Sequence, residues 1–164
     1  MGELVVNEKK HISFTEEIKK IRTNLKFSAV TEDKKIIVIT SCNPSEGKSY
    51  ISANLASAFA MNNEKILLID CDLRKGRQKK IFLVKNDRTS GLSNLLLNKN
   101  WRNEYKNYIQ ETKVPNLSVI PTGPYPPNPS ELLASPRFKH FLNEIEKEYD
   151  YIFLDCPPLV GLND

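Results

Sequence analysis

The sequence contains few of the residues that build disulfide scaffolds or zinc sites. Its 164 residues include two histidines and three cysteines, Cys42, Cys71 and Cys156, whose spacing matches no disulfide or zinc framework. No apolar run approaches the roughly 20 residues needed to cross a bilayer, and the first ten residues lack the apolar core of a signal peptide. These absences predict a cytoplasmic protein whose thiols are reduced.

Charge of one sign is not in large excess either. Lysine and arginine number 24 and aspartate and glutamate 20, so the net charge of +4 is too small to indicate nucleic-acid binding. The basic residues are nevertheless uneven, and one short stretch contains Arg74, Lys75, Arg77, Lys79 and Lys80. We interpret this stretch either as a solvated loop or as a surface for phosphate, an anionic membrane or an acidic partner.

The most informative segment is a loop between an apolar run and a helical pattern. The run at 36–39 leads into Ser-Cys-Asn-Pro-Ser-Glu-Gly-Lys-Ser at 41–49, and Ile51, Leu55 and Phe59 follow at helical spacing. In such a loop, backbone N–H groups and the positive end of the helix cradle nucleotide phosphates, the lysine reaches the outer phosphates, and the serine ligates Mg²⁺. The expected nucleotide contacts are Asn43, Pro44, Ser45, Glu46, Gly47, Lys48, Ser49 and Tyr50.

Three carboxylates, Asp70, Asp72 and Asp155, follow apolar strands. Ligands of a doubly wound sheet bind beyond the carboxyl ends of its strands, so these acids should face the nucleotide; simple strand capping is the alternative. We expect Asp155 to bind Mg²⁺ through water, Asp72 to share that task, and Asp70 to accept or orient the proton of an attacking hydroxyl. Arg74 is expected to stabilise phosphate charge or to pair with an acid. Together with Lys48, the three acids form the predicted catalytic set.

The cysteines also follow predicted strands, so the three thiols are expected to lie near one another. We interpret them as small buried residues, with redox sensitivity of the nucleotide site as the alternative hypothesis.

The alternation of apolar strands with helices predicts one α/β domain of the P-loop type over residues 1–164, with a mostly parallel sheet flanked by helices. Residues 1–13 are expected to form a flexible tail and 14–28 an amphipathic helix that breaks at 31–33. The predicted strands are 34–41, 65–69, 117–120 and 151–154. A short helix is predicted at 92–97, segment 98–116 is left unassigned, and Asn128 and Glu131 should form a capping box for a helix that restarts at Ser135. The C-terminal strands of such a fold are expected to be missing.

These motifs together resemble the bacterial tyrosine kinases of capsule and exopolysaccharide synthesis. Residues 66–74 match the family's apolar strand followed by D-x-D-x-R, and residues 151–158 match its Walker B strand. Residues 123–133 are similar to its G-x-x-P-x-N-P-x-E-L-L segment. The family's E-x-x-R-x-x-R-T-N helix is represented by Glu16, Lys19 and Arg22, with lysine in place of the first arginine.

The resemblance implies an enzyme that uses Mg²⁺ and ATP to phosphorylate protein tyrosines. It also implies a ring-shaped self-oligomer formed through Glu16, Lys19 and Arg22, an activating membrane chain-length regulator, and a cognate phosphatase. The protein would then lie at the inner face of the plasma membrane, held there by its activator, and would regulate polysaccharide synthesis and export.

This chain departs from the family pattern at several positions. Cys42 and Ser45 replace glycines of the loop, Tyr50 stands where threonine is usual, and Gly76 stands where proline is frequent. No tyrosine cluster follows Asp164, which leaves Tyr105 and Tyr108 as the expected exposed phosphoacceptors.

Two alternatives remain open. A partitioning or division-site ATPase of the ParA/MinD type would share the Walker B strand, but it would carry a signature lysine at the position of Asn43. A non-catalytic, truncated nucleotide-binding subunit would bind nucleotide weakly or only dock on a partner.

Overall fold

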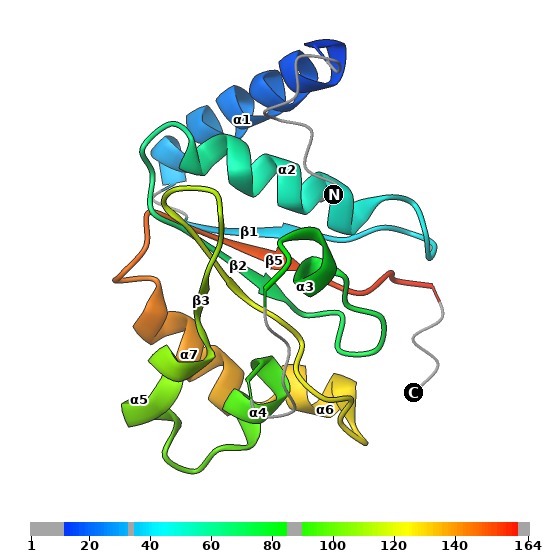
Figure 1. The fold of residues 1–164 in the computed structure, drawn as a ribbon, viewed down its shortest axis with the longest axis vertical. Coiled ribbons are helices and arrows are strands. Elements are labelled where there is room, and N and C mark those ends of the chain that lie inside the picture. The colour runs from blue at the N-terminus through cyan, green and yellow to red at the C-terminus, as the bar shows by residue number, and fades with distance from the viewer. Residues whose placement is uncertain (1–11, 33–34, 85–89, 161–164) are drawn as a thin grey trace.

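Within the described residues, 12–32, 35–84 and 90–160, the computed structural model contains one five-stranded sheet (Figure 1). Its strands are β1 (Ile36–Ile39), β2 (Ile66–Asp70), β3 (Gln110–Glu111), β4 (Leu117–Ile120) and β5 (Tyr151–Asp155). Their order is β1-β5-β2-β4-β3, with β3 antiparallel to β4 and the other neighbours parallel. The mostly parallel P-loop sheet predicted from the sequence is therefore confirmed.

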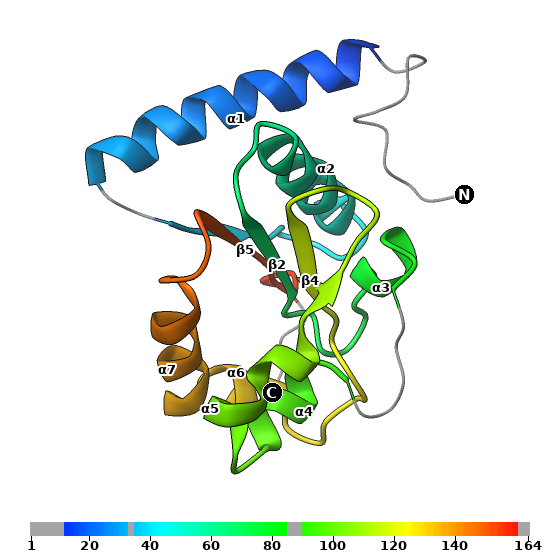
Figure 2. The same ribbon diagram turned by 60° about the vertical axis from the view of Figure 1, so that its left-hand side comes forward.

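Helices cover both faces of this sheet (Figures 1 and 2). One face carries α2 (Lys48–Ala60) and the short α3 (Gln78–Ile81), and α1 (Ile12–Glu32) lies across the outside of α2. The other face carries α4 (Leu92–Leu97), α5 (Trp101–Glu104), the 3₁₀ turn η2 (Tyr105–Tyr108), α6 (Pro129–Leu133) and α7 (Pro136–Ile145). None of the helices in the described ranges has the length and apolar character needed to span a bilayer.

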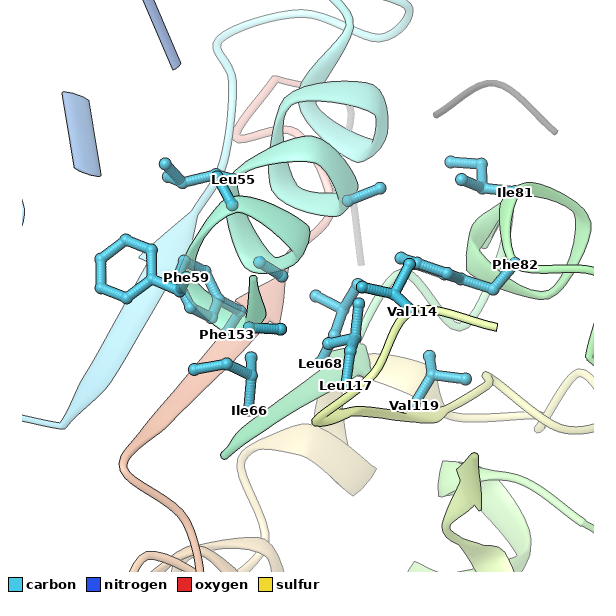
Figure 3. Packing of buried hydrophobic residues seen from close by; sticks show 14 of the residues in the cluster. Leu55, Phe59, Ile66, Leu68, Ile81, Phe82, Val114, Leu117, Val119 and Phe153 are labelled. Carbon is cyan, nitrogen blue, oxygen red and sulfur yellow. The ribbon is translucent and has the colours of Figure 1, made fainter. Parts of the chain in front are cut away.

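Alternate residues of each strand enter two separate hydrophobic clusters. Leu68 points toward α2 and packs in a cluster with Phe59 and Phe153 (Figure 3). Leu67 belongs to the opposite cluster, which contains Phe141 of α7. All five side chains are fully buried, as expected for a parallel sheet covered on both sides. These two layers hold the carboxyl ends of the strands in fixed register.

Several predicted elements agree closely with the structure, and others differ at their ends. The predicted helix 92–97 coincides with α4, whereas α1 continues through Thr31 and Glu32, where a break was expected. Ile21 is 40% exposed, because α1 buries only a narrow stripe containing Ile18 against α2. Residues 1–11, the greater part of the predicted tail, lie outside the described residues.

The unassigned segment 98–116 contains α5, η2 and β3, and α3 was also missed. These elements are four residues or fewer, too short to show a hydrophobic period. The predicted capping box is wrong: the Asn128 side chain caps no backbone N–H and instead donates a 2.9 Å hydrogen bond to Glu131. The restart at Ser135 is confirmed, since Ser135 Oγ accepts a hydrogen bond from the N–H of Phe138 at 3.3 Å.

Candidate functional site

A cleft of about 260 Å³ lies at the carboxyl edge of the sheet. It is bounded by three segments that leave β1, β2 and β5, because parallel strands deliver their following loops to one edge. Its lining includes the phosphate-loop and α2 residues Pro44, Ser45, Gly47, Lys48, Ser49 and Tyr50. The segment after β2 contributes Asp72, Arg74, Lys75 and Arg77, and the segment after β5 contributes Pro157, Pro158 and Val160.

The loop before α2 is held by its own side chains. The backbone N–H of Asn43 donates to Glu46 Oε2 and the Asn43 amide donates to Glu46 Oε1, both at 3.1 Å. These hydrogen bonds lower the pKa of the exposed Glu46 carboxylate. Gly47 adopts φ +88° at the start of α2, a left-handed conformation that favours glycine. Asn43 and Glu46 brace the loop from outside and do not line the cleft, unlike the other six predicted nucleotide contacts.

Lys48 and Asp72 form an enclosed ion pair inside the cleft. Lys48 Nζ lies 2.9 Å from Asp72 Oδ2, and the two side chains are only 11% and 6% exposed. The other carboxylate oxygen of Asp72 accepts the backbone N–H of Lys75 at 3.0 Å. The structure therefore brings together the predicted lysine of the phosphate loop and one predicted acid.

Asp70 lies beneath the cleft, and it is not among the lining residues. It is 1% exposed, and its oxygens accept backbone N–H groups of Asp72 at 3.3 Å and of Gln78 at 3.0 Å. Burial, and secondarily the charge of Asp155 beside it on β5, raises the pKa of Asp70 well above its ordinary value. A Cβ at Gly76 would lie 2.6 Å from Asp70 Oδ2, so glycine is required for this close approach.

Asp155 ends β5 and is fully buried. Its Oδ2 accepts a 2.7 Å hydrogen bond from Gln78 Nε2, whereas Oδ1 has no hydrogen-bond partner among the described residues. Burial raises the pKa of Asp155, and hydrogen bonds from Gln78 and Ser49 partly oppose that rise. Gln78 could not be recognised from the sequence, because a single glutamine within a basic stretch shows no pattern that separates it from a solvated loop.

The arrangement of Ser49, Asp72 and Asp155 fits Mg²⁺ bound together with a nucleotide. Within the described ranges, no group of three or more His, Cys, Asp or Glu side chains is placed to hold a metal by itself. Mg²⁺ usually binds one or two protein carboxylates and completes its shell with water and substrate phosphates. The unpartnered Asp155 Oδ1, buried beside the Ser49 hydroxyl, suits that mode.

Two of the three cysteines lie together at this edge of the sheet. The Cys71 thiol is buried and hydrogen-bonds to Cys156, whereas Cys42 is exposed. The hydrogen bond and burial raise the pKa of Cys71 well above its ordinary value, and the same hydrogen bond lowers the pKa of Cys156. The expectation of small buried residues holds for Cys71 but is wrong for Cys42, because the phosphate loop carries Cys42 outward.

The predicted oligomerisation residues on α1 divide into two groups. Glu16 and Lys19 form an exposed ion pair at 2.9 Å. Arg22 instead reaches α2 and donates a 2.9 Å hydrogen bond to the carbonyl of Ala58, near the end of that helix. Arg22 thereby joins α1 to α2 within one chain.

Comparisons with known proteins agree with this geometry. A family model described as an AAA domain matches residues 34–163. The "Putative tyrosine-protein kinase CapB" of Staphylococcus aureus is 43% identical over 161 residues, which cover 98% of this chain and 68% of that protein. Tyrosine-protein kinase YwqD of Bacillus subtilis is 40% identical, with 92% and 61% covered. The chain therefore spans roughly two thirds of the length of these relatives.

Solved structures separate the kinases from the division-site ATPases. The kinase domain of Escherichia coli tyrosine kinase ETK superposes with a TM-score of 0.88 at 34% identity, over 96% of this chain and 60% of that one. The Pyrococcus furiosus cell division ATPase MinD is more distant, with a TM-score of 0.64 and 26% identity over 78% of this chain and 52% of that one. The chain belongs to the P-loop family of bacterial tyrosine kinases.

Proposed function

We propose that this chain binds Mg-ATP in the cleft and transfers the γ-phosphate to tyrosine hydroxyls of proteins, including its own. The observation that carries the proposal is the enclosed Lys48–Asp72 pair, whose two residues both line the cleft. The names of the relatives support tyrosine as the acceptor.

Lys48 is proposed to exchange Asp72 for a nucleotide phosphate. A phosphate carries more negative charge than a carboxylate and competes directly for the ammonium group. Once Lys48 contacts the phosphate, Asp72 is released to share metal binding with Ser49 and Asp155. Bound Mg²⁺ would neutralise charge on the phosphates and orient them for transfer.

Arg74 and its neighbours are proposed to stabilise charge that develops during transfer. Arg74, Lys75 and Arg77 all line the cleft together with residues of the phosphate loop. Because the transferred phosphoryl group spreads negative charge over its oxygens, cations at this wall lower the barrier more than they tighten ground-state binding.

Asp70 is proposed to accept or orient the proton of the tyrosine hydroxyl. Its raised pKa brings it closer to the range in which a carboxylate is an effective base. For this role, one of its backbone hydrogen bonds must be exchanged for a bond to the hydroxyl. Asp70→Asn should therefore reduce kcat much more than ATP affinity; equal losses would assign Asp70 a structural role.

The cellular role is proposed from the family. The chain would act at the inner face of the plasma membrane, bound to a membrane chain-length regulator that activates it. It would assemble into a ring through Glu16, Lys19 and Arg22, and a cognate phosphatase would reverse its modification. Cycling between the two states would regulate capsule or exopolysaccharide synthesis and export.

The proposal is tested by incubating the purified chain with Mg-ATP and the cytosolic tail of a candidate activator, followed by a phosphotyrosine blot. A signal that disappears in Lys48→Met supports the kinase. ATP hydrolysis without phosphotyrosine would favour an ATPase of the ParA/MinD type. Nucleotide binding without either reaction would favour the non-catalytic subunit.

A further inference from the structure

Gln78 is a buried amide in a basic stretch whose charged residues are exposed or half-buried. The residue is fully buried at the start of α3, whereas its neighbours Arg77 and Lys80 are exposed. A buried amide costs free energy unless its hydrogen bonds are satisfied. The amide nitrogen of Gln78 has such partners, whereas Oε1 has none among the described residues. Its own backbone N–H already bonds Asp70 at 3.0 Å, which ties the segment after β2 to the strand end.

The side-chain nitrogen of Gln78 joins two other segments of the site. Nε2 lies 2.7 Å from Asp155 Oδ2, 3.0 Å from the carbonyl of Ser49 and 3.0 Å from Ser52 Oγ. A carboxylate and a backbone carbonyl can only accept hydrogen bonds, so both require the nitrogen of the amide on their side. The orientation of the amide is therefore determined by Asp155 and Ser49 together.

This bridge determines how Asp155 presents its second oxygen. Oδ2 is occupied by Gln78, and Oδ1 is left buried without a partner among the described residues. The same amide nitrogen contacts the carbonyl of Ser49, so one side chain connects Asp155 to the first turn of α2. Groups that orient a ligating carboxylate in this way commonly change metal affinity about 10–100-fold when removed.

We propose that Gln78 is a positioning residue for the metal end of the nucleotide site: its amide holds Asp155 and the first turn of α2 in the arrangement that accepts Mg²⁺ with a nucleotide. The inference rests on the nucleotide-binding part of the proposed function and does not depend on which hydroxyl is phosphorylated. Gln78 touches neither nucleotide nor metal in this role, and it acts through Asp155 and Ser49.

The first test measures how strongly Mg²⁺ tightens ADP binding. A fluorescent ADP analogue is titrated into the wild-type chain and into Gln78→Met, once with Mg²⁺ and once with EDTA. Methionine keeps the length of the side chain but cannot donate a hydrogen bond. The factor by which Mg²⁺ lowers the Kd of the ADP analogue should therefore be about tenfold smaller in the variant. Affinity in EDTA should stay within about twofold, since Gln78 does not line the cleft.

A control variant separates positioning from a general effect on the short helix. Lys80→Met changes an exposed residue of α3 and should keep the wild-type dependence on Mg²⁺. If Lys80→Met loses as much as Gln78→Met, or if folded Gln78→Met keeps the full tightening, the inference is wrong. Wild-type protein that shows no tightening would overturn both this inference and the proposed function.

A second measurement needs no substitution at the site. The chain has two glutamines, Gln78 and Gln110, so labelling glutamine with ¹⁵N gives two side-chain NH₂ groups. Gln110 lies on β3 and bonds Ser90, and it serves as the internal control. The Gln78 signals should shift when Mg²⁺ is added to the ADP complex while those of Gln110 stay in place. Gln78 side-chain signals whose chemical shifts do not change when Mg²⁺ is added would overturn the proposal, even if Gln78→Met fails to fold.

Discussion

The Lys48 ammonium group lies 2.9 Å from a carboxylate oxygen of Asp72, and both side chains are nearly enclosed. The lysine of the phosphate loop is thus held by an acid from the next strand end. The pair holds Lys48 within the cleft, and in the proposed function a nucleotide phosphate would replace Asp72 as its partner. It also means that a substitution of Lys48 changes the stability of the protein as well as its chemistry.

Lys48→Met should reduce phosphoryl transfer by at least about 100-fold, because the charge on the outer phosphates loses its partner. It should also lower the free energy of unfolding by about 1–3 kcal/mol, since Asp72 is left buried without its counter-ion. Phosphotyrosine blots and urea unfolding measure the two effects. In a double-mutant cycle with Asp72→Asn, the two stability losses should not add. Strict additivity would show that the ion pair contributes nothing.

The charge of Asp70 should make the stability of the wild-type protein depend on pH in a way that Asp70→Asn does not share. The pKa of Asp70 is raised in the folded state, so folding favours the protonated carboxyl, and this contribution is lost as pH rises through the raised pKa. Asparagine carries no charge at any pH, but its amide nitrogen cannot accept one of the two backbone N–H groups that Asp70 accepts, and that cost does not depend on pH. The free energy of unfolding of Asp70→Asn, relative to the wild type, should therefore rise as the pH is raised in a series of urea unfolding measurements. Asp150→Asn, at an exposed acid, is the matched control, and a difference independent of pH would contradict this explanation.

Arg22→Ala should destabilise the chain whether or not a ring forms. Its guanidinium group donates to the carbonyl of Ala58 at the negative end of α2, a charged hydrogen bond that typically contributes about 1.5–3 kcal/mol. A smaller oligomer in this variant would therefore be ambiguous. Glu16→Ala and Lys19→Ala alter only an exposed pair, so they should keep the wild-type Tm and shift sedimentation toward the monomer. Wild-type sedimentation in both would refute the ring.

Tyr125 should be phosphorylated before Tyr105 or Tyr108. Tyr125 is 65% exposed in the loop before α6, whereas Tyr105 and Tyr108 are half-buried. The hydroxyl of Tyr105 donates a hydrogen bond to Glu148, which raises the pKa of Tyr105 to about 12. The hydroxyl of Tyr108 accepts a hydrogen bond from the side-chain amide of Asn98 at 3.0 Å. The expectation that Tyr105 and Tyr108 are exposed is thus wrong, because η2 packs them against α7 and α4. Mass spectrometry of the modified chain, with Tyr125→Phe as control, checks the order; early label on Tyr105 would reverse it.

The elements that the sequence predicts accurately are those with a long and regular local pattern of apolar residues. The strand 151–155 and the helix 92–97 show sustained apolar sequences, and both were assigned almost to the residue. The helix α3 could not be found, because its four residues are helical through contacts made by Gln78 and Ile81 with distant segments. The capping box at Asn128 failed for a related reason: the spacing permits it, but the two side chains bond each other.

The sequence by itself determined the class of the fold and the chemistry available at one edge of the sheet. The site could be predicted because a buried strand precedes Gly-Lys-Ser and acids directly follow two other strands. Local periodicity identifies these strands, and the topology of a parallel sheet brings their carboxyl ends to one edge. Tertiary structure alone decided which acid meets Lys48, that Asp70 lies beneath the cleft, and that Gln78 connects Asp155 to Ser49. Those relationships depend on side-chain rotamers and on hydrogen bonds between residues 8 to 77 positions apart, and no spacing along the chain encodes them.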